Sequence, residues 1–112
     1  MKLGWPRRID PRLFTPAEDR DAPVQIRYLG TAGLVIETEQ HAVVMDPYVT
    51  RPSLLTTAFQ PLVPNVDLIR AKIPRADDVL IGHAHHDHVL DAPDLCKLTG
   101  GRFIGAPDAC NV

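Results

Sequence analysis

The stretch Val79–Leu95, "VLIGHAHHDHVLDAPDL", limits the choice of fold because it joins an apolar run to a dense histidine cluster. Four of the chain's five histidines fall within six positions directly after the apolar residues. A short continuous apolar run is typical of a strand that is covered on both faces, as in the parallel part of a sheet. The sequence therefore predicts that a group of imidazoles lies at the carboxyl end of a buried strand.

The cluster has the pattern H-x-H-x-D-H, formed by His83, His85, Asp87 and His88. In extended backbone, side chains two positions apart leave on the same face, so His83 and His85 are predicted to point the same way. Zn²⁺ and neighbouring first-row metals accept imidazole nitrogen and carboxylate oxygen as ligands. Without a metal, crowded imidazoles repel one another whenever they are protonated. We interpret the cluster as half of a metal site that can serve two adjacent cations, with His86 outside it.

Three short strands are predicted ahead of this stretch, between Val24 and Pro47. The segments "VQIRYLG", "GLVIETE" and "AVVMDP" carry the apolar and β-branched residues of strands, and the short turns "TA" and "EQH" separate them. This succession is typical of a β-meander. We expect His41, in the second turn, to be a solvated turn residue.

The remaining elements follow from capping signals. Pro47–Pro64 contains four prolines and is interpreted either as a lid beside a site or as an ordinary surface excursion. Asn65 is the expected N-cap of a short amphipathic helix. Asp91 is the expected N-cap of a second helix that ends at Gly100, and a strand is predicted over residues 102–106. The predicted fold class is therefore α+β, a mostly antiparallel meander followed by a β-α-β unit.

The two ends of the chain differ from its centre. Residues 1–23 contain four prolines and no sustained apolar period, which indicates an irregular arm ahead of one domain over residues 24–112. The last residues, "PDACNV", read as the first turn of a further helix. We interpret this ending as that of a fragment truncated at its carboxyl end, or of a chain whose missing layer a partner supplies.

Composition narrows the function classes. The net charge of −2, without a run of Lys or Arg, gives no support for nucleic-acid binding. No apolar run approaches the roughly 18 residues of a membrane span, and "MKLGWPRRID" lacks the apolar core of a secretory signal. Cys96 and Cys110 sit in no CxxC pattern and are interpreted as reduced thiols. We therefore expect a cytoplasmic protein without a transmembrane segment.

The motifs together resemble a known family. "HAHHDH" after an apolar strand resembles the signature of the metallo-β-lactamase superfamily, and "IRYLGTAGLVIETEQHAVVMDPYV" resembles the opening strands of that fold. "LGTAG", "MDPY" and "IGHAHHDHVLDAP" are similar to the branch that includes lactonase-like and N-acyl-phosphatidylethanolamine phospholipase D-like hydrolases. The resemblance covers about residues 24–110. It implies the N-terminal half of a four-layer αββα sandwich.

The resemblance also implies roles for individual residues. It assigns His83 and His85 to a first metal and Asp87 and His88 to a second, with Asp87 also positioning the attacking hydroxide. It places Asp46 beside the metals as a residue that supports their ligands. Relatives take further ligands from later in the chain, whereas this sequence contains no histidine beyond His88.

The expected function is a metal-dependent hydrolase, with two Zn²⁺ per intact site and Mn²⁺ or Fe²⁺ as alternatives. Its substrate would be a small-molecule or lipid-like ester, lactone, amide or phosphodiester. The 112-residue chain alone is expected to be inactive, because two ligands per metal hold the ions weakly. Two alternatives remain: a non-catalytic metal-binding module completed as a homo-oligomer, and an iron-dependent oxidoreductase on the same scaffold.

Overall fold

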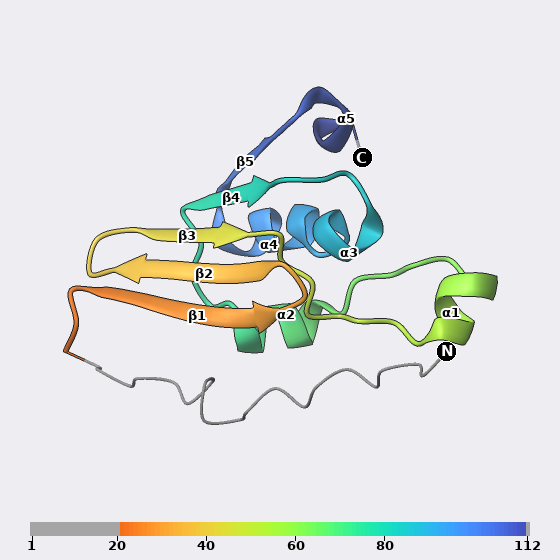
Figure 1. Ribbon diagram of the computed structural model, residues 1–112, viewed down its shortest axis with the longest axis horizontal. Helices are drawn as coiled ribbons and strands as arrows, with labels where there is room; N and C mark the ends of the chain where they lie inside the picture. Colours follow the sequence, from red (N-terminus) through yellow and green to blue (C-terminus); the bar gives the residue numbers. More distant parts are fainter. Residues whose placement is uncertain (1–20, 112) are drawn as a thin grey trace, which may run out of the picture.

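The fold is built on one five-stranded sheet with the strand order β1-β2-β3-β4-β5 (Figure 1). The computed structural model describes residues 21–111, so nearly all of the predicted arm over residues 1–23 lies outside the described residues. The strands are β1 (Val24–Gly30), β2 (Gly33–Thr38), β3 (Ala42–Met45), β4 (Asp78–Ile81) and β5 (Arg102–Gly105). β1, β2 and β3 pair in antiparallel fashion, and β4 and β5 add in parallel. The predicted meander and β-α-β unit are thus confirmed.

Five helices connect or follow the strands. They are α1 (Leu54–Phe59), α2 (Val66–Lys72), α3 (His86–Val89), α4 (Ala92–Thr99) and α5 (Pro107–Cys110). α1 falls inside the proline-rich connection, which was predicted without a helix, and none of its residues is buried. The hydroxyl of Ser53 caps it by accepting the N–H of Thr56 at 3.1 Å, a local signal that the prolines on either side obscure.

The predicted helix boundaries at Asn65 and Gly100 are confirmed. The side chain of Asn65 accepts the backbone N–H of Leu68 at 3.0 Å at the start of α2. Gly100 has φ of 75° at the end of α4, and its N–H donates to the carbonyl of Cys96 at 2.8 Å. Glycine suits this left-handed position because it has no Cβ to clash with the preceding turn. These caps fix where the helices stop and the neighbouring strands begin.

The hydrophobic core lies between one face of the sheet and the helices. Val35, Val44 and Val79 stand in register on β2, β3 and β4, and each is completely buried. Ile69 of α2 and Leu95 of α4 belong to the same buried cluster. Full burial of one such side chain contributes about 1.5–3 kcal/mol, so this layer fixes how α2 and α4 sit on the sheet.

The opposite face of the sheet is apolar and open. One row of apolar side chains crosses all five strands in register: Tyr28, Leu34, Met45, Leu80 and Ile104. No member of the row is buried within the described part of the chain, and Tyr28 is 67% exposed. Ile26, on the same face, is 68% exposed. A sheet face of this composition is normally covered by another layer of structure.

The amino-terminal end of β4 carries a charged network. The guanidinium of Arg102 contacts both carboxylate oxygens of Asp78, at 2.7 and 3.0 Å. His41 lies in the turn between β2 and β3 with 49% of its side chain exposed, as expected of a solvated turn residue, and its Nε2 also lies 2.8 Å from Asp78 Oδ2. This contact could not be predicted, because the two residues are 37 positions apart in the sequence.

Candidate metal centre

The histidine motif lies where β4 ends and α3 begins, at the carboxyl edge of the sheet (Figure 1). The strand stops at Ile81, and His85 is the extended residue that precedes the single turn of α3. The N–H groups of His88 and Val89 both donate to the carbonyl of His85, at 3.0 and 3.1 Å. This tight turn folds the second half of the motif back toward the first half.

The structure brings His83 and His85 together. Nε2 of His83 lies 2.8 Å from Nδ1 of His85, and their ring centroids are 4.0 Å apart. Two nitrogens that bind one zinc ion in tetrahedral geometry at about 2.0–2.1 Å stand roughly 3.3 Å apart. The facing nitrogens of His83 and His85 lie at hydrogen-bond distance, so a small movement apart would give them the spacing of two ligands of one cation.

His88 forms a second group with the two aspartates of the predicted site. Its Nε2 lies 3.7 Å from Asp87 Oδ2, and its Nδ1 lies 3.3 Å from Asp46 Oδ2. Nδ1 is buried and makes no hydrogen bond within the described structure, because the contact with Asp46 lacks hydrogen-bond geometry. A buried polar atom without a partner costs about 1–3 kcal/mol, and such atoms mark functional sites in native proteins. The ring of His83 lies 5.5 Å from that of His88, so the two groups are neighbours.

Asp46 is held firmly in this position. Its Oδ1 accepts the N–H of Gly82 at 2.7 Å, and its own N–H donates to the carbonyl of Leu80 at 2.9 Å. A Cβ at Gly82 would lie 3.2 Å from Asp46 Oδ2, so glycine is what allows this close approach. Asp46 itself has φ of 42°, an uncommon conformation that persists only where the surroundings enforce it.

The side chain of Asp91 plays a different part from the one predicted. Asp91 is the N-cap residue of α4, as predicted, but its side chain makes no capping hydrogen bond there. Asp91 is fully buried and accepts the N–H of Val49 at 2.6 Å, the N–H of Thr50 at 2.8 Å and the hydroxyl of Thr50. Sequence reasoning missed this role because an aspartate ahead of a helix is usually its cap.

Reciprocal hydrogen bonds to two aspartates thus link the segments 46–50 and 82–91. Asp46 of the first segment accepts a backbone N–H of the second, and Asp91 of the second accepts backbone N–H groups of the first. The ring of Tyr48 meets that of His86 edge-on, with centroids 5.9 Å apart. Burial raises the pKa of the Tyr48 hydroxyl, and the charges of Asp87 and Asp91 raise that pKa further. These hydrogen bonds, at Gly82 before the motif and at Asp91 after it, therefore hold the histidine segment against the segment 46–50.

The donor types suit a metal, but these side chains lie in pairs and do not form a closed site. Among residues 21–111, no three His, Cys, Asp or Glu side chains are grouped so that they could hold a metal ion. His83 and His85 form one pair, and Asp87 and His88 form the other. Neutral imidazole and carboxylate suit Zn²⁺ and other first-row divalent metals. Structural zinc sites have four protein ligands and catalytic ones have three, so each pair lacks at least one ligand.

Comparisons with known proteins identify the family of the chain. A sequence model described as "Beta-lactamase superfamily domain" matches residues 25–100. A UPF0173 metal-dependent hydrolase of Pyrobaculum arsenaticum is 32% identical over 83 residues, which are 74% of this chain and 32% of that protein. The UPF0173 metal-dependent hydrolase YtkL of Bacillus subtilis is 28% identical over 81 residues, 72% of this chain and 30% of that protein.

A solved structure resembles the chain as well. Igni18, described as a novel metallo hydrolase from Ignicoccus hospitalis, superimposes with a TM-score of 0.53 at 27% sequence identity, covering 71% of this chain and 30% of that one. The predicted fold class is thereby confirmed as an N-terminal part of the metallo-β-lactamase fold. The chain spans about a third of the length of the curated relatives it matches. The narrower branch suggested by "MDPY" and "LGTAG" stays a prediction.

Proposed function

Because the chain belongs to the beta-lactamase superfamily, we propose that it supplies the first metal ligands of a metal-dependent hydrolase. The observation that carries this proposal is the pair of facing nitrogens of His83 and His85, 2.8 Å apart at the carboxyl edge of the sheet. The names of the relatives, which are metal-dependent hydrolases, support the reaction class.

In this proposal, His83 and His85 hold one ion, and Asp87 and His88 hold a second. The ions are zinc, with Mn²⁺ or Fe²⁺ as the alternatives that the same donors accept. A bound metal of this kind lowers the pKa of a coordinated water toward about 7 and so supplies hydroxide for hydrolysis. Nδ1 of His88 lies 3.3 Å from Asp46 Oδ2, which leaves Nε2 on the side of Asp87 for a metal. Metal-binding histidines usually present their second nitrogen to a carboxylate, and Asp46 takes that supporting role.

Asp87 lies where it can both bind a metal and position the attacking water. Its carboxylate is half-exposed, with 39% of the side chain accessible, whereas that of Asp46 is nearly buried. An accessible carboxylate beside a metal can accept a proton from the nucleophile as it attacks. We therefore assign the catalytic role to Asp87 and a positioning role to Asp46.

The match covers 32% of the Pyrobaculum relative, which supports the proposal that the missing ligands come from residues outside this chain. Beyond His88 the sequence offers no histidine, and each ligand pair is incomplete. The open apolar face supports the same idea, because Tyr28 and Ile26 are two-thirds exposed on a face that a second sheet would bury. We propose that this chain is the amino-terminal part of a four-layer sandwich, and that it has little activity on its own.

The substrate we propose is a small-molecule or lipid-like ester, lactone, amide or phosphodiester. This range follows from the reaction class, since an activated water attacks any of these carbonyl or phosphoryl centres. Both cysteines of the described chain are free, which supports a reducing compartment such as the cytoplasm. No helix among residues 21–111 is long and apolar enough to cross a membrane.

The test is hydrolysis by the intact protein of a generic phosphodiester and of a lactone. His85→Ala and Asp87→Ala should each abolish turnover of whichever substrate is accepted. His86→Ala is the matched control, because His86 stands in the same turn but contacts Tyr48 and neither ligand pair. Full activity in both ligand variants would rule out the proposal. Purified protein that contains iron and consumes oxygen with its substrate would instead favour the redox alternative.

A second function is favoured by one observation, the open apolar face. If two copies of this chain bury that face against each other, the product is a metal-binding module without the hydrolase half. The described chain should then form a dimer that tightens with zinc in sedimentation equilibrium. A monomer whose mass does not change with zinc would exclude this alternative.

A further inference from the structure

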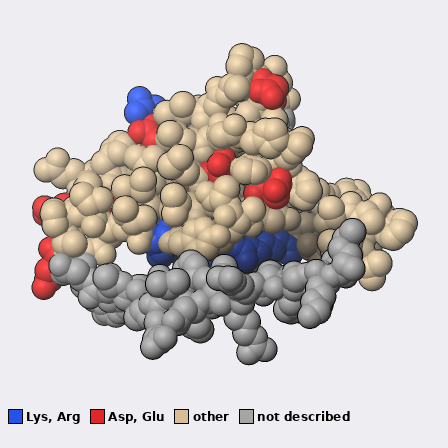
Figure 2. All heavy atoms as spheres, viewed as in Figure 1, with Lys and Arg blue, Asp and Glu red and all other residues tan. Residues whose placement is uncertain are grey.

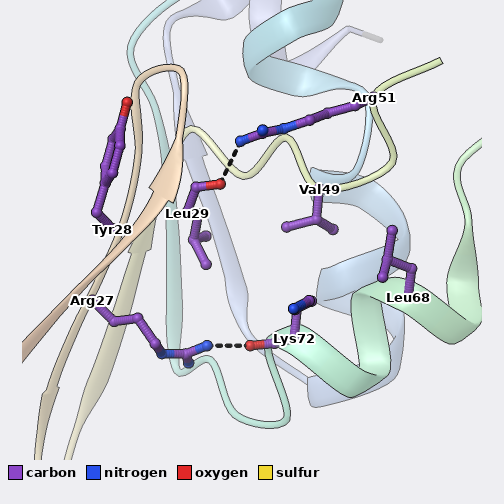
Figure 3. Close-up of a pocket in the computed structure, with 7 residues that line it drawn as sticks. All are labelled: Arg27, Tyr28, Leu29, Val49, Arg51, Leu68 and Lys72. Carbon is purple, nitrogen blue, oxygen red and sulfur yellow. Dashed lines mark hydrogen bonds between the residues drawn. The ribbon is translucent and has the colours of Figure 1, made fainter. Parts of the chain in front are cut away.

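A pocket of about 330 Å³ lies apart from the histidine motif, between β1, α2 and the segment that follows Asp46 (Figure 3). Three basic side chains and three aliphatic ones account for most of its wall: Arg27, Arg51, Lys72, Leu29, Val49 and Leu68. Figure 3 shows Arg27 and Lys72 at one end, Arg51 at the other, and the aliphatic side chains between them. The three cations come from three separate segments, so the fold and not local sequence brings them together.

The two arginines are held in place by backbone carbonyls. Arg51 donates from Nη2 to the carbonyl of Leu29 at 2.6 Å and from Nε to the carbonyl of Tyr48 at 3.1 Å. Arg27 donates from Nη1 to the carbonyl of Lys72 at the end of α2. Gly30 makes room for Arg51, because a Cβ there would lie 1.6 Å from Arg51 Nη2. Each guanidinium has five N–H donors, so several remain available to a ligand after these contacts.

The positive charge of the pocket is not neutralised from within. No aspartate or glutamate of the described residues lines it. Glu37 of β2 lies 3.8 Å from Arg27 Nη2 and offsets part of its charge, whereas Lys72 takes part in no ion pair in the part of the chain that the structure describes. The whole chain carries a net charge of −2, so three cations around one cavity are a local concentration of positive charge. In the view of Figure 2, Lys and Arg atoms appear only in a few small groups on a surface formed mostly by other residues.

We propose that this pocket binds a small organic anion, with a phosphate or carboxylate group and a short apolar body. Lys72 and Arg27, at one end of the pocket, would bind the anionic group through charge-assisted hydrogen bonds, and Arg51 at the other end would add to the positive potential. Leu29 and Val49 would contact the apolar body. A volume of about 330 Å³ exceeds what a bare phosphate needs and lies within the range of small-ligand pockets. The proposal does not depend on the metal site, because none of these residues belongs to either ligand pair.

Calorimetric titration of the full chain, after metal has been removed by dialysis, tests this proposal. The probes are monobutyl phosphate, butyrate, inorganic phosphate and butanol. We expect saturable one-to-one binding of a butyl anion, tighter than that of inorganic phosphate, and no binding of butanol. The better of the two butyl anions identifies the preferred head group. Affinity should fall as salt is added, because the contacts are ionic.

Two variants separate the pocket from general electrostatic attraction. Lys72→Gln should lower the affinity for the more tightly bound butyl anion about tenfold or more, since it removes one charged donor. Lys97→Gln is the matched control, because Lys97 is an exposed lysine of α4 that contacts only Asp94. Lys97→Gln should leave the affinity unchanged. No saturable binding of either butyl anion, equal affinity for inorganic phosphate, or an equal loss in both variants would overturn the proposal.

Discussion

Replacing Asp91 with alanine should destabilise the chain more than any other single carboxylate substitution near the motif. Asp91 is fully buried, and its two oxygens accept the N–H groups of Val49 and Thr50 as well as the Thr50 hydroxyl. Alanine leaves two backbone donors without a partner. Each such donor costs about 1–3 kcal/mol, and water reaches the partly exposed Val49 and Thr50, which keeps the cost toward the lower value. We expect a loss of about 3 kcal/mol.

Such a loss is a large fraction of the 5–15 kcal/mol that stabilises a typical domain. The assay is urea unfolding, with the free energy of unfolding extrapolated to water. Asp91→Asn should give an intermediate loss of about 1–2 kcal/mol, because the amide oxygen still accepts an N–H but no longer carries charge. Asp94→Ala is the control in the same helix. Its exposed contact with Lys97 at 3.2 Å is worth less than about 1 kcal/mol.

The reasoning is refuted if Asp91→Ala costs no more than Asp94→Ala. That result would mean that the 46–50 segment does not depend on the carboxylate that it contacts. If Asp91→Ala lowers the free energy of unfolding by the expected amount, it should also weaken metal binding, because Asp46 belongs to the segment that Asp91 holds in place. The same two variants, titrated with zinc, measure this second effect.

Three further outcomes are expected. Hydrogen bonds from Arg102 lower the pKa of Asp78, with a smaller contribution from His41. The ion pair therefore stabilises the fold at neutral pH and loses that effect as acid protonates the carboxylate. Arg102→Gln should lower the urea midpoint at pH 7, and the midpoints of the variant and the wild type should converge in strong acid. Gly101→Ala should cost about 1–3 kcal/mol in the same assay, because its Cβ would lie 2.7 Å from a backbone carbonyl oxygen. Ile26→Lys should reduce self-association of the isolated chain in sedimentation velocity, since Ile26 is 68% exposed on the open face.

The sheet could be predicted from the sequence because its signals are local. Alternation between Val24 and Met45 and the apolar run before His83 marked four strands, and the caps at Asn65 and Gly100 marked two helices. The helix α1 was missed because prolines on both sides suggested an irregular connection. Its cap at Ser53 was present in the sequence, but the prolines were given more weight.

Contacts between distant segments could not be predicted in the same way. His41 and Asp78 are 37 positions apart, and Asp91 lies 41 positions from the threonine that it contacts. Nothing within a short window of sequence indicates such pairs, because they arise only when the sheet sets β3 beside β4. The contact between His83 and His85 could be predicted, because these two residues are close together in the sequence as well as in space.

The central claim is that His83 and His85 present their facing nitrogens to one metal ion. Crystals of the protein grown with zinc, measured above and below the zinc absorption edge, test it most directly, because anomalous scattering locates the metal itself. We predict a zinc peak in contact with Nε2 of His83 and Nδ1 of His85. Zinc bound elsewhere on the chain, with His83 Nε2 and His85 Nδ1 still 2.8 Å apart in a direct hydrogen bond, would contradict the claim.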